Sequence, residues 1–457
     1  YFPASLSFYR TTATLNFTKS NTAVIGAPGV EIRRNSGTGQ LFTFANNVTD
    51  VVVSDIKFHQ VISPAGAFIA MGLGQSNIRI NFVRCWFEAE GAQVVLQTWN
   101  GTRTVLAAGN VNKNVTFRDC VIDGTGAFST APNTVSATGV NIAFEHCLFI
   151  NAIATGAHLV LQGLGRKDLD GPFLVSDSHF EAGTGTWRPL IIQQIYGAII
   201  KGNVIRSTQG ILITQNGDYP ASAGPNFDVN ILGNVIEIDN TGQVGQNGIE
   251  LATPTTGTDV LLRGSIVGNQ IGTVGVPSSG SPQGVGIYGG LYNTTFSDNV
   301  FNNWTWVFSF NYATVLRVII KGNHLHGGTL TGGSNSIQGS VTPTGPVFIQ
   351  GNIDNSNNGI NLPGGSFSGF FFYQNRGFNP QGVAAITPGA SPYTYTNNDG
   401  VPEEVHIDGG TVTTVAKNAI TLYSFGGAAA RCAVWLEPGE ALTVTYTVVP
   451  VVNKDRK

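Results

Sequence analysis

Five residues near the middle of the chain have side chains that could cleave or bind a sugar polymer: Asp168, Asp170, Glu181, Trp187 and Arg188. Hydrolysis of a glycosidic bond needs one protonated carboxyl group as acid and one ionised carboxylate as base or nucleophile, about 5 to 9.5 Å apart. The three acidic residues are therefore candidate catalytic groups. Trp187 and Arg188 are candidate substrate-binding residues, because sugar rings stack on aromatic faces. A solvated loop whose charges pair locally is the alternative.

A second group of candidate binding residues is aromatic. Trp304 and Trp306 are two positions apart, which would place both rings on one face of a single strand, and Tyr288 precedes them by about half a repeat. Such faces stack on sugar rings, so these three residues are also predicted to bind substrate. Burial in the core or in an interface between subunits is the alternative, because alternation buries aromatic side chains too.

Other acidic residues and the histidines are set aside for stated reasons. Pairs at i and i+2, such as Glu237 with Asp239 and Glu88 with Glu90, are routine on exposed strand faces. Five single residues occupy one position of the repeat, are interpreted as turn residues and are excluded from the catalytic set; they are Asp55, Asp119, His146, Asp177 and Asp298. The histidines show no metal-ligand spacing with nearby carboxylates, so the sequence predicts no metal site and no cofactor.

The composition limits the class of protein that these residues can belong to. Only 11% of the 457 residues are charged and 59 are glycine, whereas a typical soluble domain is about 25% charged. Strands and tight turns are therefore expected instead of amphipathic helices. The net charge of −3, without a Lys/Arg cluster, argues against a nucleic-acid partner, and no apolar run of about 20 residues predicts membrane insertion. The start at Tyr1, without Met or a leader, suggests that a segment precedes it.

One short pattern recurs along most of the chain: apolar residues, a two-residue break, then apolar-x-apolar. The equivalent position is filled by Ile56, Cys85, Cys120, Cys147, Ser178, Asn203, Asn234, Asn269, Asn299, Asn323, Asn352 and Asn375. Successive copies lie roughly 23 to 35 residues apart, a variable spacing. Helical repeats keep a nearly fixed length, but a coil of a β-helix fixes only its strands and lets its loops vary. The pattern therefore predicts a parallel β-helix of about a dozen coils.

The asparagines in this column indicate how the coils would stack. Neighbouring coils lie about 4.8 Å apart, so equivalent side chains fall above one another. Buried Asn side chains then donate to and accept from the next coil, which satisfies polar groups that would otherwise cost stability. Gly precedes several of these Asn residues, at Gly202, Gly233, Gly268, Gly322 and Gly351, as a left-handed turn requires. The three cysteines of the column are predicted to form a buried, reduced stack.

These motifs resemble a known family, the pectate-lyase-like right-handed β-helices with an asparagine ladder in a short turn. The opening Tyr1-Phe2-Pro3-Ala4, with Asn21-Thr22-Ala23-Val24-Ile25-Gly26 and Gly29-Val30-Glu31-Ile32, is similar to the first coils of phage tailspikes and related virion proteins. The resemblance covers residues 1–380. It implies an all-β fold, a right-handed parallel β-helix, for this part of the chain.

Residues 381–457 show a different pattern and are predicted to form a small antiparallel β module. Short strand-like runs such as 404–407, 411–415, 433–436 and 441–446 alternate with turns. The motif Leu436-Glu437-Pro438-Gly439-Glu440-Ala441 resembles a C-terminal unit of phage appendage proteins, in which it acts as a tip or trimer-forming cap. Because the open end of a β-helix exposes unpaired strand edges, a cap or three-fold partner is expected there, which predicts a homotrimer.

Three functions are consistent with the sequence. The first is a tailspike-like appendage of a virus particle that binds bacterial surface polysaccharide alongside other virion proteins, with glycoside hydrolysis by a polysaccharide depolymerase left open. The second is a non-catalytic structural fibre or capsid decoration protein. The third is a secreted polysaccharide lyase, which would need a calcium or basic cluster that the sequence does not show. The fold alone does not choose among them, because this scaffold hosts many functions.

Overall fold

The structure is a computed structural model of the 457-residue chain. It describes residues 8–34, 41–45, 47–60, 67–71, 78–89, 93–96, 112–124, 133–151, 157–163, 171–181, 188–214, 226–241, 246–252, 260–275, 280–311, 315–327, 335–339, 343–354, 359–361, 369–376, 382–398 and 402–456. These residues form strands and turns, and none of their segments is a helix able to cross a membrane. The chain divides into two compact units, Tyr1–Thr294 and Thr295–Lys457.

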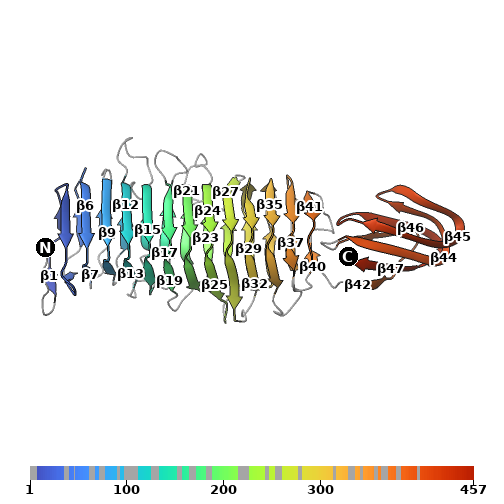
Figure 1. Cartoon of the computed structure of the whole chain (residues 1–457), viewed down its shortest axis with the longest axis horizontal. Helices are drawn as coiled ribbons and strands as arrows, with labels where there is room; N and C mark the ends of the chain where they lie inside the picture. The colour runs from blue at the N-terminus through green and yellow to red at the C-terminus, as the bar shows by residue number, and fades with distance from the viewer. Residues whose placement is uncertain are drawn as a thin grey trace. The chain divides into compact units, whose positions relative to one another are not determined.

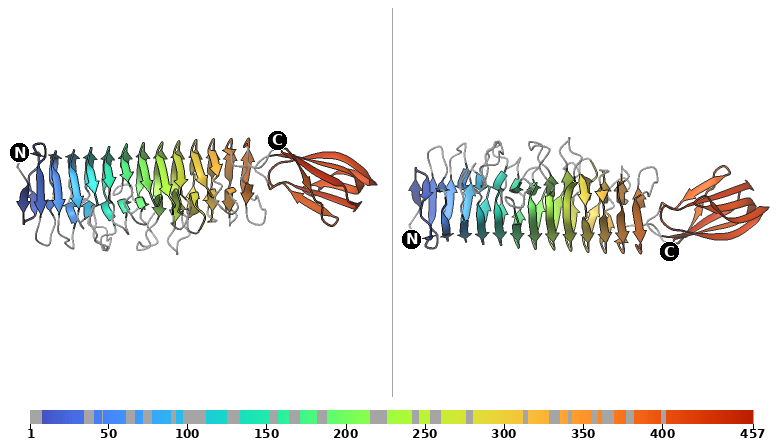
Figure 2. Two further views of the ribbon diagram at one scale, coloured as in Figure 1. Left: turned by 90° about the horizontal axis from the view of Figure 1, so that it is seen from below. Right: turned by 90° about the horizontal axis from the view of Figure 1, so that it is seen from above.

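In the first unit, each circuit of the chain adds one strand to each of three parallel sheets, which we name A, B and C (Figures 1 and 2). Sheet A contains β1 (Tyr9–Thr11), β4 (Glu31–Arg34), β7 (Lys57–Gln60), β10 (Trp86–Ala89), β13 (Val121–Asp123), β16 (Leu148–Ile150), β19 (His179–Glu181), β22 (Val204–Ser207), β25 (Val235–Asp239) and β28 (Gln270–Val274). Sheet B contains β2 (Leu15–Phe17), β5 (Phe42–Phe44), β8 (Ala67–Met71), β11 (Gln93–Leu96), β14 (Asn133–Ala137), β17 (Ala157–Gln162), β20 (Arg188–Gln193), β23 (Ile211–Thr214), β26 (Ile249–Ala252) and β29 (Gln283–Tyr288). Sheet C contains β3 (Thr22–Ile25), β6 (Thr49–Ser54), β9 (Ile78–Val83), β12 (Lys113–Arg118), β15 (Val140–Glu145), β18 (Phe173–Ser176), β21 (Tyr196–Lys201), β24 (Asn226–Leu232) and β27 (Val260–Val267), which also pairs with β30 (Gly290–Tyr292).

The second unit contains parallel strands of the same kind and an antiparallel sheet. Its parallel strands pair as β31 (Thr295–Ser297) with β35 (Val318–Lys321), β38 (Val347–Gln350) and β41 (Phe370–Tyr373); as β32 (Val300–Trp304) with β36 (His324–Gly327) and β39 (Ile353–Asp354); and as β33 (Trp306–Phe310) with β37 (Asn335–Gly339) and β40 (Gly359–Asn361); β34 (Val315–Leu316) is a further short strand. The antiparallel sheet has the order β42 (Gly382–Ile386), β47 (Val451–Arg456), β44 (Glu403–Lys417), β46 (Ala441–Val448) and β43 (Tyr393–Thr396), and β45 (Ile420–Leu436) pairs with β44. The predicted all-β fold, a parallel β-helix with a C-terminal antiparallel module, is confirmed. The predicted domain bounds, 1–380 and 381–457, stay a prediction.

The turn from sheet C to sheet A is short in coil after coil, and its first residue adopts the left-handed conformation. The residues at this position include Asp55, Asp119, His146, Asp177 and Asp298, with φ between 51 and 60°, and glycines such as Gly202 and Gly233, with φ of 65 and 61°. Asp, Asn and Gly tolerate this conformation best. The interpretation of these acidic residues as turn residues is therefore confirmed.

The second residue of the turn forms the predicted asparagine ladder. Asn234 Oδ1 accepts hydrogen bonds from the backbone N–H and the side-chain amide of Asn203, at 3.0 and 2.9 Å. Asn234 in turn donates to the carbonyl oxygen of Ile200 and to Asn269 Oδ1, both at 2.9 Å. The same contacts link Asn299, Asn323, Asn352 and Asn375. Buried amides are thus satisfied coil by coil, which fixes the register of the stack.

Earlier in the column, the predicted cysteine stack is present. Cys85, Cys120 and Cys147 are buried free thiols, and their Sγ atoms donate to carbonyl oxygens of the preceding coil. The hydrogen-bonded thiol of Cys120, together with burial, raises the pKa of Cys85. A raised pKa disfavours the reactive thiolate of Cys85. All three cysteines are buried and act as small core side chains.

The core between the sheets consists of stacked apolar side chains. Phe82, Phe117 and Phe144 lie one above another on sheet C, with ring centroids 4.7 and 5.0 Å apart. Phe149 and Phe180 stack in the same way on sheet A, at 4.4 Å. Outward-facing positions alternate with these inward ones along each strand. The outward faces of the sheets are therefore where a ligand can bind.

Candidate functional site

Sheet B receives the long connections of the coil. Sheets C and A are joined by two residues in several coils, for example Asp177 and Ser178 between β18 and β19. The connections that enter sheet B include residues 182–187, 240–248 and 275–282, and those that leave it include 163–172, 215–225 and 253–259. Variable connections on a rigid scaffold are where binding and catalytic residues concentrate. A binding or catalytic site is therefore expected on the outward face of sheet B.

Two of the residues predicted to bind substrate, Arg188 and Tyr288, lie on this face and flank the same carboxylate. Arg188 begins β20, Glu250 lies on β26, and Tyr288 ends β29. Arg188 Nη2 is 2.9 Å from Glu250 Oε2, with side chains only 18 and 21% exposed. Glu250 is in register with Gly286 of β29, two residues before Tyr288. The two predicted residues thus meet at a third residue, Glu250, that the sequence interpretation had not considered.

Amide side chains complete the site. Asn247 Nδ2 donates to Glu250 Oε2 at 3.3 Å, and Gln283 Nε2 donates to the phenolic oxygen of Tyr288 at 2.7 Å. Gly286 lies beneath them: a Cβ there would come within 2.9 Å of the Tyr288 ring, Asn247 Nδ2 and Gln283 Oε1. The absence of a side chain at this position therefore lets Tyr288 lie close to the sheet, with 36% of its surface exposed.

The electrostatics keep Tyr288 a hydrogen-bond donor. Burial, together with the neighbouring Glu250 carboxylate, raises the pKa of Tyr288, so the phenol is protonated at neutral pH. The outward positions in register with Tyr288 along sheet B are uncharged: Ala252, Thr214 and Gln193. Gln162 Nε2 extends this row by donating to Gln193 Oε1 at 3.0 Å. Such a row of neutral hydrogen-bonding groups beside an aromatic ring suits the hydroxyl groups and apolar faces of sugars.

Hydrolysis would need a second carboxyl group beside Glu250. Within the strands of sheet B that belong to the first unit, Glu250 is the one acidic residue. Its carboxylate already pairs with Arg188. The described part of this face therefore has a binding surface with one ion-paired acid, and a catalytic pair would have to include residues of the connections.

The predicted catalytic residues Asp168, Asp170 and Glu181, and the predicted substrate-binding residue Trp187, are only partly described by the structure. Asp168, Asp170 and Trp187 lie outside the described residues, so their roles stay predictions. Glu181 ends β19 on sheet A and is exposed. Its backbone carbonyl oxygen accepts a hydrogen bond from Nε2 of the buried His158 at 3.1 Å.

The prediction that Trp304 and Trp306 share one strand face is wrong. Trp304 ends β32, Trp306 begins β33, and the chain turns at Thr305 between them. Trp304 is fully buried and Trp306 is half-buried. Period-two alternation holds only within a strand, so it fails across a corner between two sheets. The Trp304 ring belongs to the core, as the alternative interpretation held.

Sequence reasoning missed Glu250, Asn247 and Gln283. Glu250 follows Arg188 by 62 residues and lies two strands away from it in sheet B, because β23 separates β20 from β26. A coil-by-coil alignment could have placed Glu250 on the outward face of sheet B. It could not have shown that the Arg188 side chain extends across β23 to Glu250. That reach depends on side-chain conformation, which the repeat does not encode.

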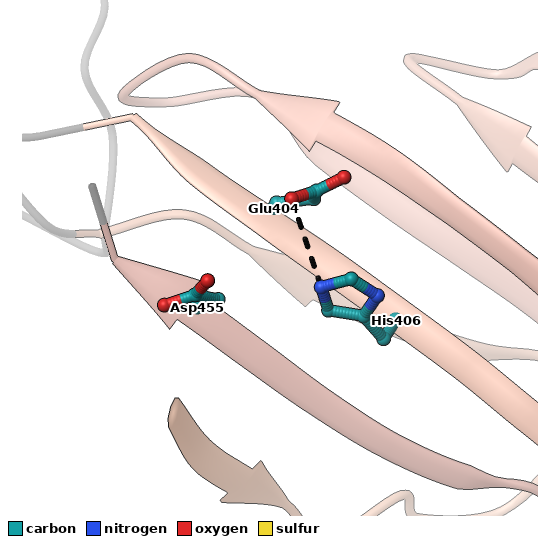
Figure 3. A group of neighbouring side chains, drawn as sticks. All are labelled: Glu404, His406 and Asp455. Carbon is teal, nitrogen blue, oxygen red and sulfur yellow. Dashed lines mark ion pairs between the residues drawn. The ribbon is translucent and has the colours of Figure 1, made fainter. Parts of the chain in front are cut away.

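The antiparallel sheet has a separate cluster of possible metal ligands, shown in Figure 3. Glu404 and His406 lie on β44, Asp455 lies opposite Glu404 on β47, and their ligand atoms are within 4.8 Å of one another. His406 Nε2 is 3.7 Å from Glu404 Oε2, and both side chains are at least one-third exposed. Acidic groups with a histidine are common on exposed strands, and Glu404 and Asp455 make further interactions. We assign no ion to this cluster.

No protein-family model matches the sequence, and no curated protein sequence matches it. Among solved structures, the chain is similar to a double mutant of the tailspike protein of E. coli bacteriophage HK620, with a TM-score of 0.52 and 10% identity over 99% of this chain and 87% of that one. The Azotobacter vinelandii mannuronan C-5 epimerase AlgE4 A-module gives a TM-score of 0.46 and 13% identity over 82 and 89% of the two chains. Tailspike protein 3 of bacteriophage CBA120 gives 0.48 and 14% over 85 and 59%. At these identities the likeness concerns the fold alone: the chain is a right-handed parallel β-helix.

Proposed function

We propose that this protein is an appendage of a virus particle that binds bacterial surface polysaccharide on the outward face of sheet B. The observation that carries the proposal is the meeting of Arg188 and Tyr288 at Glu250, beside a row of uncharged amide and hydroxyl side chains. Tyr288 provides a ring for stacking, and Asn247 and Gln283 hold Glu250 and the phenol in place. A polymer can run along such a row, because its rungs repeat at the coil spacing of about 4.8 Å.

The proposal that the protein belongs to a virus particle is based on sequence motifs and not on the site at Glu250. The first coils and the segment 436–446 resemble those of phage appendage proteins, and a phage tailspike protein has the same fold. We therefore propose a virion location and contacts with other virion proteins. These motifs are independent of Arg188, Glu250 and Tyr288, so the location and the binding site can be tested separately.

Replacing Tyr288 by alanine is expected to weaken polysaccharide binding about tenfold, because a sugar-stacking ring contributes about 1.4 kcal/mol. Binding is measured by calorimetry with capsular and lipopolysaccharide preparations from a panel of bacteria. The matched control is Tyr373→Ala, since Tyr373 is 50% exposed on β41 of the second unit. Equal affinity of the Tyr288→Ala variant and the wild type for a polysaccharide that the wild type binds would contradict the proposed site.

A non-catalytic fibre is the second candidate function, and the pairing of the described acids favours it. Glu250 pairs with Arg188, Asp55 with Arg84 and Glu145 with Arg118. Release of new reducing ends from a bound polysaccharide decides between the candidates. Release that is lost in Asp168→Asn or Asp170→Asn, with binding retained, establishes a glycoside hydrolase; binding without release establishes an adsorption fibre.

We also propose that the protein is a homotrimer whose subunits meet at β45. Within the antiparallel sheet, this strand pairs with β44, and its outer residues include Ile420, 69% exposed, and Leu422. An exposed apolar edge strand is unfavourable in an isolated protein and typical of an interface. Burying it against two further copies would cover that edge.

The double variant Ile420→Asp, Leu422→Asp is expected to convert the trimer to monomers, because it places charges in an apolar interface. Sedimentation equilibrium measures the mass of each species. The control Thr421→Asp changes an exposed residue between them and is expected to leave the trimer intact. A monomeric wild type, or a double variant of unchanged mass, would contradict the proposed interface.

A further inference from the structure

A groove lies in the first unit, away from Glu250, at the corner between sheets C and A in the early coils. Its volume is about 360 Å³. Its lining residues come from three successive coils and include Gly29, Glu31, Asp55, Lys57, Arg84 and Trp86. Glu31, Lys57 and Trp86 are in register on β4, β7 and β10, so they form one continuous outward row of sheet A.

Trp86 provides the apolar surface of this groove. Its side chain is 39% exposed, which is unusual for the largest apolar residue. Lys57 Nζ lies 5.0 Å from the ring centroid of Trp86 and pairs with Glu88. The cation and its partner therefore hold the indole in one orientation on the groove wall.

The polar groups of the groove are fixed and electrically balanced. Arg84 donates to both carboxylate oxygens of Asp55, at 2.6 and 2.9 Å. Hydrogen bonds from the guanidinium of Arg84 lower the pKa of Asp55, so this pair stays ionised at neutral pH. Two carboxylates, Glu31 and Asp55, thus face two cations, Lys57 and Arg84. Their charges cancel, which disfavours a strongly charged ligand.

A buried histidine beside the groove, two residues after Lys57 on β7, holds its acidic edge in place. His59 is 7% exposed. Its Nδ1 is 3.2 Å from Glu31 Oε1 and its Nε2 is 3.8 Å from Glu88 Oε1. Arg33 Nε donates to the same Glu31 oxygen at 2.7 Å. Glu31 is therefore a preorganised acceptor, unlike a mobile surface glutamate.

We propose that this groove is a second saccharide-binding site, in which one uncharged pyranose ring stacks on Trp86 and its hydroxyl groups bind Glu31, Lys57 and the Asp55–Arg84 pair. An exposed indole beside fixed, paired charges offers an apolar face together with adjacent donors and acceptors, which is the pattern that a sugar ring presents. Charge balance and a volume near the lower limit of small-ligand pockets fit one or two neutral rings.

The choice of ligand rests on the proposed function, but the site does not share residues with the face of sheet B. A long polysaccharide that engages both sites would gain avidity without any new contact at Glu250. A short glycoside would occupy each site alone. The two sites can therefore be distinguished by short ligands and site-specific probes.

The experiment uses the full chain labelled with 5-fluorotryptophan and ¹⁹F NMR. The chain has six tryptophans, and a Trp86→Phe variant identifies the Trp86 signal. The methyl glycosides of glucose, galactose, mannose and N-acetylglucosamine are titrated one at a time, with glycerol as a non-sugar polyol. We expect at least one glycoside to shift the Trp86 signal with a saturable millimolar dissociation constant. The signal of Trp435, 44% exposed on β45, is the internal control.

The variant Arg84→Met tests the polar half of the site. The Arg84 side chain is 60% exposed, so the protein should fold, and the dissociation constant of the same glycoside should rise about tenfold. No shift of Trp86 with any of the four glycosides, or equal shifts of Trp86 and Trp435, would overturn the proposal. The Tyr288→Ala variant separates the two proposals. If its polysaccharide affinity equals that of the wild type, the sheet B site is refuted. If the Trp86 signal of the same variant still responds to the glycoside, the proposed site at Trp86 is upheld.

Discussion

Replacing Asn234 by alanine is expected to destabilise the middle coils of the first unit by about 3 to 5 kcal/mol. The variant leaves the buried N–H of Asn203 and the carbonyl oxygen of Ile200 without the partners that Asn234 provides. It also removes the amide that binds Asn269. A buried polar group without a partner costs about 1 to 3 kcal/mol. The N–H of Asn203 and the carbonyl oxygen of Ile200 each lose a partner, whereas Asn269 Oδ1 loses one of two bonds and keeps the backbone N–H of residue 234. The loss is large because Asn203 and Asn234 are both buried, each with 1% of its surface exposed.

Hydrogen exchange of the Asn203 amide measures this loss locally, which suits a repeat protein whose unfolding need not be two-state. The matched control is Asn230→Ala. Asn230 lies on the outward side of β24, where Ser265 Oγ donates to its side-chain oxygen, and its replacement is expected to cost less than about 1 kcal/mol. Equal exchange rates for Asn203 in the two variants would show that the asparagine column does not hold the coils together.

Lowering the pH from 7 to 4 is expected to cost about 3 kcal/mol of stability through His158 alone. This residue is fully buried on β17, beside the rings of Phe149 and Phe180. Burial lowers the pKa of His158 from 6.5 to about 4, and its hydrogen bond to the Glu181 carbonyl oxygen opposes this only partly. Between these values the unfolded chain takes up a proton that the folded chain does not. The destabilising contribution of His158 is therefore absent well above pH 6.5, grows as the pH falls, and reaches its full value below about pH 4.

The variant His158→Gln isolates this contribution, because glutamine keeps a donor for the Glu181 carbonyl oxygen and does not titrate. Urea unfolding midpoints of both proteins are measured from pH 7 to pH 4. We expect the pH dependence of the variant to be flatter by about 3 kcal/mol. Parallel curves for the wild type and His158→Gln would rule out a buried neutral histidine.

The fold could be predicted from the sequence because one column of residues encodes it. The Asn, Cys and Gly positions indicate a two-residue turn that recurs in coil after coil. In the structure these residues lie in that turn, as the pattern predicted. The acids before the column have the left-handed backbone of the predicted turn, and their exclusion from the catalytic set stays a prediction. At this turn the same residues set the local backbone conformation and the stacking of one coil on the next.

The sites could be predicted only in part, because they depend on contacts between coils. Arg188 and Tyr288 were proposed as binding residues from their residue types, which stays a prediction. Glu250 was missed because its partner Arg188 lies two strands away. His59 and Glu88 occupy the third position after the column residues Ile56 and Cys85, so a coil-by-coil alignment would have revealed their row. The prediction that Trp304 and Trp306 share a strand face was wrong because the chain turns between them, and side-chain alternation does not continue across a corner between sheets.

The measurement that tests the central claim most directly is hydroxyl-radical footprinting of the protein with a polysaccharide that it binds. Oxidation of each exposed tyrosine is compared with and without the polymer. Binding on the face of sheet B predicts that Tyr288 is protected severalfold, while Tyr373, which is 50% exposed on β41, is oxidised as before. Unchanged oxidation of Tyr288 in a saturated complex would contradict the assignment of the polysaccharide-binding site to Arg188, Glu250 and Tyr288.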